Sequence, residues 1–127
     1  MQIVPTYSAV LALIYIGLSY RAIRLRRTFG IAIGDGGQEM LLRATRVHSN
    51  FAEYVPLNLL LMHFLERTGT NPWFLHALCA TLIMGRLLHA RGVWQTPEPP
   101  GYRVAGMALT FISMIASALM LLTLQLA

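Results

Sequence analysis

The chain has 127 residues, of which 56% are hydrophobic and only 12% are charged, and its mean hydropathy is +0.57. A soluble domain carries about 25% charged residues, so this composition excludes an ordinary soluble protein and indicates a membrane protein with one small domain. The net charge is +5 and every basic residue is an arginine, but the arginines flank apolar runs and leave no room for a nucleic-acid-reading domain, which argues against a nucleic-acid partner.

Residues 4–20 form the first apolar run, which is long enough for a transmembrane helix. The run has no positively charged segment before it, so it lacks the layout of a cleaved secretory signal. The densest basic cluster of the chain follows it and marks this end as cytoplasmic: Arg21, Arg24, Arg26 and Arg27. The glycines in residues 28–37 then predict a loop, because glycine destabilises a helix interior.

Residues 39–66 are predicted to form the second transmembrane helix. Within it Arg46, Asn50 and Glu53 fall within roughly 60° of one another at 100° per residue, and Arg43 lies on the same side. Charged side chains in the hydrocarbon region cost roughly 2.5–3.5 kcal/mol each on insertion scales. This polar stripe is therefore expected to face the bundle interior, to pair within itself, or to meet a polar ligand.

Residues 72–91 and 102–126 are predicted to form the third and fourth transmembrane helices. Asn71 followed by a proline is typical of a helix N-terminus, and it opens the third helix. A turn with three prolines separates the last two helices, and Glu98 in this turn is expected to be exposed.

Four helices of alternating direction bring the polar residues of the chain to one membrane face. In the third helix Arg86 and His89 lie three residues apart and share a face, while Arg103 lies in the first turn of the fourth. The expected cluster has many positive charges and a single carboxylate, Glu53. Because arginine grips carboxylates and phosphates, the cluster favours a small anionic ligand, with an amine group directed to Glu53.

Other kinds of site are not indicated. The sequence has no nucleophile–His–Asp arrangement and no His/Cys metal set, so we expect no metal. Cys79 is the only cysteine and lies within an apolar run, where a small buried side chain is expected rather than a reactive thiol.

The motif Arg46-x-x-x-Asn50-x-x-Glu53-Tyr54-x-Pro56 resembles the second-helix signature of the MAPEG family, the membrane-associated proteins in eicosanoid and glutathione metabolism. The GDGG loop followed by RVHSNFAEYVPL is most similar to the small bacterial members, and the resemblance extends over the whole chain. It implies a four-transmembrane-helix bundle that forms a homotrimer in the bacterial inner membrane. Glutathione, as co-substrate, would lie between neighbouring subunits near the cytoplasmic face.

The resemblance also assigns roles to individual residues. Those assigned to glutathione binding are Arg26, Arg46, Asn50, Glu53, Tyr54, Arg86 and His89, with Arg27 as the alternative to Arg26. Arg103 is assigned the catalytic role, in which a nearby cation raises the ionised fraction of the glutathione thiol. The implied activity is that of a glutathione-dependent transferase or peroxidase acting on lipophilic electrophiles from the bilayer.

The chain departs from the family pattern at two points. Eukaryotic relatives often carry a tyrosine one turn beyond the position of His89, where this chain has Val93. Glycine and proline crowd the turn before Arg103, which can shift its alignment with the family's catalytic arginine by one position. Both departures bear on rate and substrate rather than on binding.

A second class of function also fits these residues. A non-catalytic trimeric membrane protein would use the polar stripe for assembly or would bind anionic lipid headgroups with its arginines. Binding of glutathione to the purified protein distinguishes this alternative from the enzyme.

The distribution of arginines predicts that both termini lie on the non-cytoplasmic side. The loop after the first helix carries four arginines, whereas the opposite charges of Glu66 and Arg67 in the next loop cancel each other. A reporter that is active only in the cytoplasm should therefore be silent when fused to the C-terminus, while a periplasmic reporter should be active there. A cytoplasmic C-terminus would contradict the predicted orientation.

Overall fold

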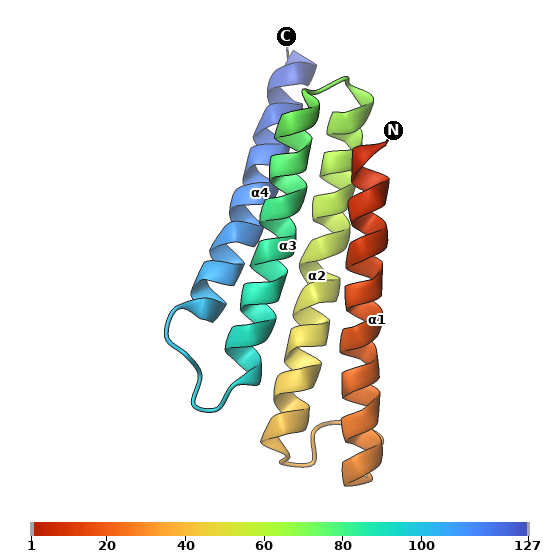
Figure 1. Cartoon of the computed structure of the whole chain (residues 1–127), viewed down its shortest axis with the longest axis vertical. Coiled ribbons are helices and arrows are strands. Elements are labelled where there is room, and N and C mark those ends of the chain that lie inside the picture. Colours follow the sequence, from red (N-terminus) through yellow and green to blue (C-terminus); the bar gives the residue numbers. More distant parts are fainter. Residues whose placement is uncertain (1, 127) are drawn as a thin grey trace.

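The computed structural model describes residues 2–126, which form four α-helices. These are α1 (Ile3–Phe29), α2 (Glu39–Arg67), α3 (Pro72–Trp94) and α4 (Tyr102–Leu126). The helices run alternately up and down, so the α1–α2 and α3–α4 loops lie at one end of the bundle (Figure 1). The α2–α3 turn, the start of α1 and the end of α4 lie at the other end. The predicted all-helical four-helix fold is thus confirmed.

The basic cluster that follows the first apolar run is helical. α1 continues past residue 20 to Phe29. Arginine is a good helix former, and its positive charge near a helix C-terminus interacts favourably with the helix dipole. The helix ends at Gly30, which adopts a left-handed φ of 66° and donates its N–H to the carbonyls of Arg26 and Arg27. The loop therefore begins later than residue 28. α3 likewise continues beyond residue 91, to Trp94.

Two caps hold the opposite end of the bundle together. The side chain of Asn71 accepts a hydrogen bond of 2.9 Å from the N–H of Trp73, which confirms the predicted start of α3. Glu66, on the last turn of α2, accepts hydrogen bonds from the N–H groups of Ile3 and Val4. These first N–H groups of α1 have no partner within their own helix, so Glu66 joins α2 to the start of α1.

The interior between α1, α2 and α3 is apolar. Its fully buried side chains include Leu11, Leu41, Val47, Met62, Leu65, Leu75, Cys79 and Leu82. Cys79 is buried as predicted. α4 joins this interior through polar contacts: Asn58 of α2 donates to the carbonyl of Thr110 at 3.1 Å and to the hydroxyl of Ser113 at 3.0 Å. Small polar residues of this kind connect helices in a membrane.

Glycines allow α3 and α4 to approach closely. A Cβ atom on Gly106 would lie 2.6 Å from the carbonyl oxygen of Gly85 and closer still to the backbone of His89. No side chain fits between the helices at this point, so the close approach depends on glycine.

Three of the four helices, α1, α3 and α4, are long and apolar enough to cross a membrane. α2 is long enough but less apolar, because it carries the polar stripe. It lies beside α1 and α3 (Figure 1), so a membrane that those helices cross is crossed by α2 as well. His48 of α2 contacts Ser19 of α1 and Phe51 stacks on Tyr15, so Glu53 is level with the apolar run of α1, whereas Arg43 and Arg46 lie toward its basic end.

Gly106→Ala is expected to destabilise the bundle by about 1–3 kcal/mol, because an added methyl group has to push two helix backbones apart. Gly17→Ala is the matched control, since a Cβ there has nothing within 4 Å, and it should be neutral or slightly stabilising. Unfolding in mixed micelles with increasing SDS measures both. Equal stability of the two variants would contradict the close packing of α3 against α4.

Candidate functional site

A cavity of about 430 Å³ opens at the end of the bundle that carries the α1–α2 and α3–α4 loops. The first half of α2 forms one wall, and the end of α3, the following loop and the start of α4 form the other. Five of the eight residues predicted to form the site line this cavity: Arg46, Asn50, Glu53, His89 and Arg103. The structure thus brings together predicted site residues from three helices.

The polar stripe of α2 supplies one wall. Arg43, Arg46, Asn50 and Glu53 all line the cavity, because residues three and four apart lie on one face of a helix. Arg46 and Glu53 are exposed, and neither forms an ion pair within residues 2–126. Arg46 and Glu53 therefore neither face the bundle interior nor pair with each other. Both side chains are therefore accessible to a polar partner from outside the chain.

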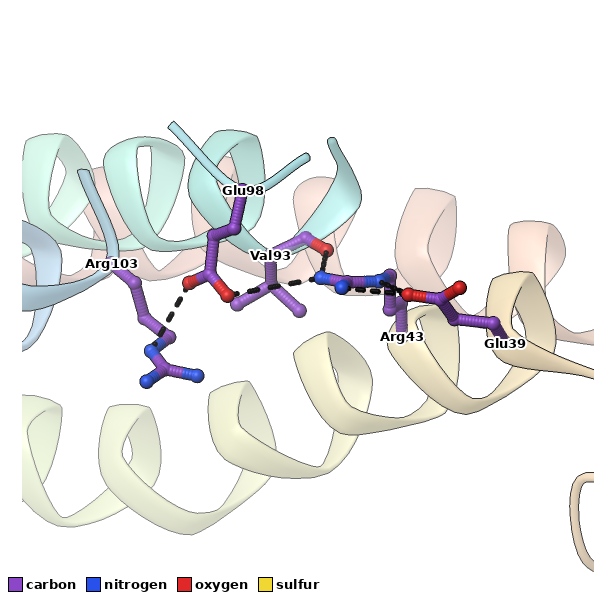
Figure 2. A network of polar contacts seen from close by, with 5 residues as sticks. All are labelled: Glu39, Arg43, Val93, Glu98 and Arg103. Carbon is purple, nitrogen blue, oxygen red and sulfur yellow. Dashed lines mark hydrogen bonds and ion pairs between the residues drawn. The ribbon is translucent and has the colours of Figure 1, made fainter. Parts of the chain in front are cut away.

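A chain of ion pairs crosses the cavity (Figure 2). Arg43 binds Glu39 at 2.8 Å, donates to the carbonyl of Val93 at 3.0 Å and lies 3.8 Å from the carboxylate of Glu98. The other oxygen of that carboxylate lies 3.2 Å from Nε of Arg103. Glu98 thus connects an arginine of α2 with an arginine of α4.

This network corrects two expectations. Glu98 is not a freely exposed turn residue, since its side chain is only 30% exposed and bridges two arginines. Nor is Glu53 the only carboxylate, because Glu39 and Glu98 also line the cavity and balance its three arginines. Glu39 could have been found from its i,i+4 spacing to Arg43. No local pattern indicated Glu98, because its contacts depend on the path of the α3–α4 loop.

Arg86, predicted to line the α3 wall, lies behind that wall. It is 3% exposed and donates to Oδ1 of Asn50 at 2.7 Å and to the hydroxyl of Thr110 at 2.5 Å. It therefore fixes the amide of Asn50, which does line the cavity. His89, one turn later on α3, supplies the cavity wall that was expected from both residues.

Arg26 and Tyr54 also lie outside the cavity. Arg26 donates to the carbonyls of Ala32 and Gly34 at 3.2 and 2.8 Å, so it holds the α1–α2 loop of its own chain. The ring of Tyr54 packs edge-on against Phe111 of α4, with centroids 5.4 Å apart. Within one chain these two side chains have structural partners rather than a place at the site.

Comparisons with known proteins connect this arrangement to a family. The model of the MAPEG family matches residues 4–123. The inner membrane protein YecN of Escherichia coli strain K12 is 34% identical over 113 residues, which cover 89% of this chain and 85% of that protein. YecN of Escherichia coli O6:H1 matches to the same extent. The comparison with solved structures returned no significant match.

Proposed function

This chain belongs to the MAPEG family, and on that premise we propose that it is a glutathione-dependent transferase or peroxidase of the bacterial inner membrane that acts on lipophilic electrophiles. The observation that carries the proposal is the cavity in which Arg46, Asn50 and Glu53 of α2 face Arg103 of α4. Its volume of about 430 Å³ is in the range of small-molecule sites, roughly 300–1,000 Å³. The arginine distribution of the loops supports a position of this end of the bundle at the cytoplasmic face.

The polar groups of the cavity match those of glutathione, which has two carboxylates, one ammonium group and one thiol. Arg46 has no acidic partner within residues 2–126 and is assigned a carboxylate, which a guanidinium can grip with two hydrogen bonds. Glu53 is the cavity carboxylate without an arginine partner in that range and is assigned the ammonium group. Asn50, held by Arg86, supplies an amide for the peptide backbone of the ligand.

Arg103 is assigned to the sulfur. A free thiol with a pKa of about 8.5 is only a few per cent ionised at neutral pH, and a nearby cation raises that fraction. In conjugation, the thiolate attacks an electrophilic carbon, a carbon–sulfur bond forms, and the bond to the leaving group breaks with its electron pair. In hydroperoxide reduction, the thiolate takes the terminal oxygen and releases the alcohol. A second glutathione then yields the disulfide and water.

A neighbouring copy of the chain completes the proposed site. Arg46 and Glu53 are exposed on the single chain, and lipid tails would offer such side chains no hydrogen bonds. A homotrimer that buries this face of α2 would remove both charges from lipid. Arg26 is occupied by its own loop, whereas Arg27 is exposed and its side chain has no polar partner within residues 2–126. Arg27 is therefore our choice for the arginine that reaches the site of the adjacent subunit.

A non-catalytic trimer that binds anionic lipid remains the second candidate. The ion pair between Glu98 and Arg103 favours it, because that pair gives Arg103 a structural partner without any ligand. Calorimetric titration of the purified protein with glutathione separates the two functions. Saturable binding supports the enzyme, and its absence supports the non-catalytic protein.

Arg103→Ala should reduce turnover of an aryl chloride electrophile by about 10²–10³, the usual cost of removing one charge-stabilising donor. Glutathione affinity should change only a few-fold, because the other cavity residues hold the ligand. The ultraviolet absorbance of the bound thiolate should fall together with the rate. Arg91→Ala is the control, since Arg91 is exposed at the end of α3, lies over the ring of Tyr102 and does not line the cavity. Equal loss of activity in both variants would rule out the assigned role.

The protein should be a trimer in mild detergent, because lipid cannot solvate the exposed charges of α2. Native mass spectrometry measures the assembly directly. The double variant Arg46→Leu, Glu53→Leu should still insert into the membrane, but it should lose glutathione binding. Detection of monomers alone for the parent protein would refute the proposed assembly.

A further inference from the structure

Glu98 occupies the place in the cavity where an anionic group of a ligand would meet Arg103. One oxygen of its carboxylate lies 3.2 Å from Nε of Arg103, and the other faces Arg43 at 3.8 Å (Figure 2). Nε is one of the donors that arginine uses when it grips an anion with two hydrogen bonds. The Glu98 carboxylate therefore takes up one of the donor directions through which Arg103 can bind a ligand anion.

The two arginines depend on Glu98 to different extents. Arg43 has other partners, since Glu39 binds it at 2.8 Å and the carbonyl of Val93 accepts from it at 3.0 Å. Arg103 is 58% exposed, and within residues 2–126 Glu98 is the only acidic side chain paired with it. Departure of Glu98 would thus leave Arg43 held in place and would free Arg103 alone.

The Glu98 side chain can leave without a large movement of the chain. It is 30% exposed at the end of the bundle, so a change of rotamer can take the carboxylate into water. Prolines 97, 99 and 100 surround it and restrict the backbone of the loop. Movement of the side chain is therefore favoured over movement of the loop.

We infer that Glu98 tunes the ionisation of the ligand bound in this site: it is an internal counter-ion that competes with the ligand's sulfur anion for Arg103. This inference rests on the proposed function. Three arginines and three carboxylates line the cavity, so the formal charge of its walls is balanced. A ligand gains the full attraction of Arg103 only if its own anion displaces Glu98, so Glu98 lowers the advantage that a ligand gains from an ionised sulfur at this position.

Glu98→Gln tests the competition because it removes the charge and keeps the shape. With glutathione bound at saturation, the ratio of thiolate to thiol at neutral pH, read from ultraviolet absorbance, should rise about three- to fivefold, the range for a partly exposed ion pair. Glu98→Ala should change the ratio in the same direction. Glu39→Gln is the matched control: it adds the same charge to the cavity but frees Arg43 instead, so the ratio should stay near that of the parent.

The same substitution in an Arg103→Ala background completes the design. There Glu98→Gln should have no effect on the thiolate ratio, because Arg103, for which Glu98 competes, is absent.

S-methylglutathione, which has no thiol to ionise, should bind the parent and Glu98→Gln with similar affinity. An unchanged ratio in Glu98→Gln, an equal rise in Glu39→Gln, or a rise that persists without Arg103 would each overturn the competition. If the parent protein binds no glutathione, the proposed function itself fails; if it binds normally and only these differences are missing, the role of Glu98 alone fails.

Discussion

The buried guanidinium of Arg86 joins three of the four helices. From α3 it donates to Asn50 of α2 and to Thr110 of α4. An isolated charge in an apolar interior is costly, and neutral oxygens around it offset that cost only when they are held at hydrogen-bonding distance. The positions of α2 and α4 relative to α3 are therefore tied to one side chain. The same contact holds Oδ1 of Asn50, which also lines the cavity, so the requirement to solvate Arg86 fixes a residue of the candidate site.

This contact requires α3 and α4 to lie unusually close together. Gly85 and Gly106 let the two backbones meet beside Arg86. Gly92 does the same near the cavity, where a Cβ atom would lie 2.7 Å from the backbone nitrogen of Arg103. These glycines place the first turn of α4 against the last turns of α3, and so bring Arg103 to the same cavity as His89. The close approach of α3 and α4 at these glycines thus both packs the bundle and assembles the site.

The charged side chains in and around the cavity fall into three groups. Arg86 is buried and solvated by the bundle itself, whereas Arg46 and Glu53 are left exposed on α2. Arg43, Glu98 and Arg103 lie between these extremes, paired but partly exposed near the end of the bundle. The first kind of charge stabilises one chain. The second has no ion-pair partner within residues 2–126, and the third is held by ion pairs between α2, the α3–α4 loop and α4.

The sequence by itself determined the helices, their order and the polar stripe of α2. These features are local: apolar runs long enough to cross a membrane are separated by glycine and proline, and residues three and four apart share a face of any helix. For the same reason Arg46, Asn50 and Glu53 were correctly expected on one wall. Arg103 was expected at the same end of the bundle from the alternating direction of the helices, and the family resemblance added its catalytic role.

Only the tertiary structure decided which side each remaining residue faces. Arg86 and His89 are one turn apart, yet Arg86 turns into the bundle and His89 into the cavity, because the rotation of α3 is set by its packing against α2 and α4. Arg26 turns back to its own loop, and Glu98 reaches two arginines from a turn far from α2 in the sequence. Helical periodicity gives the angle between residues on one helix but not the direction in which that helix faces its neighbours. That direction depends on many contacts between distant parts of the chain. A local sequence pattern does not predict these contacts.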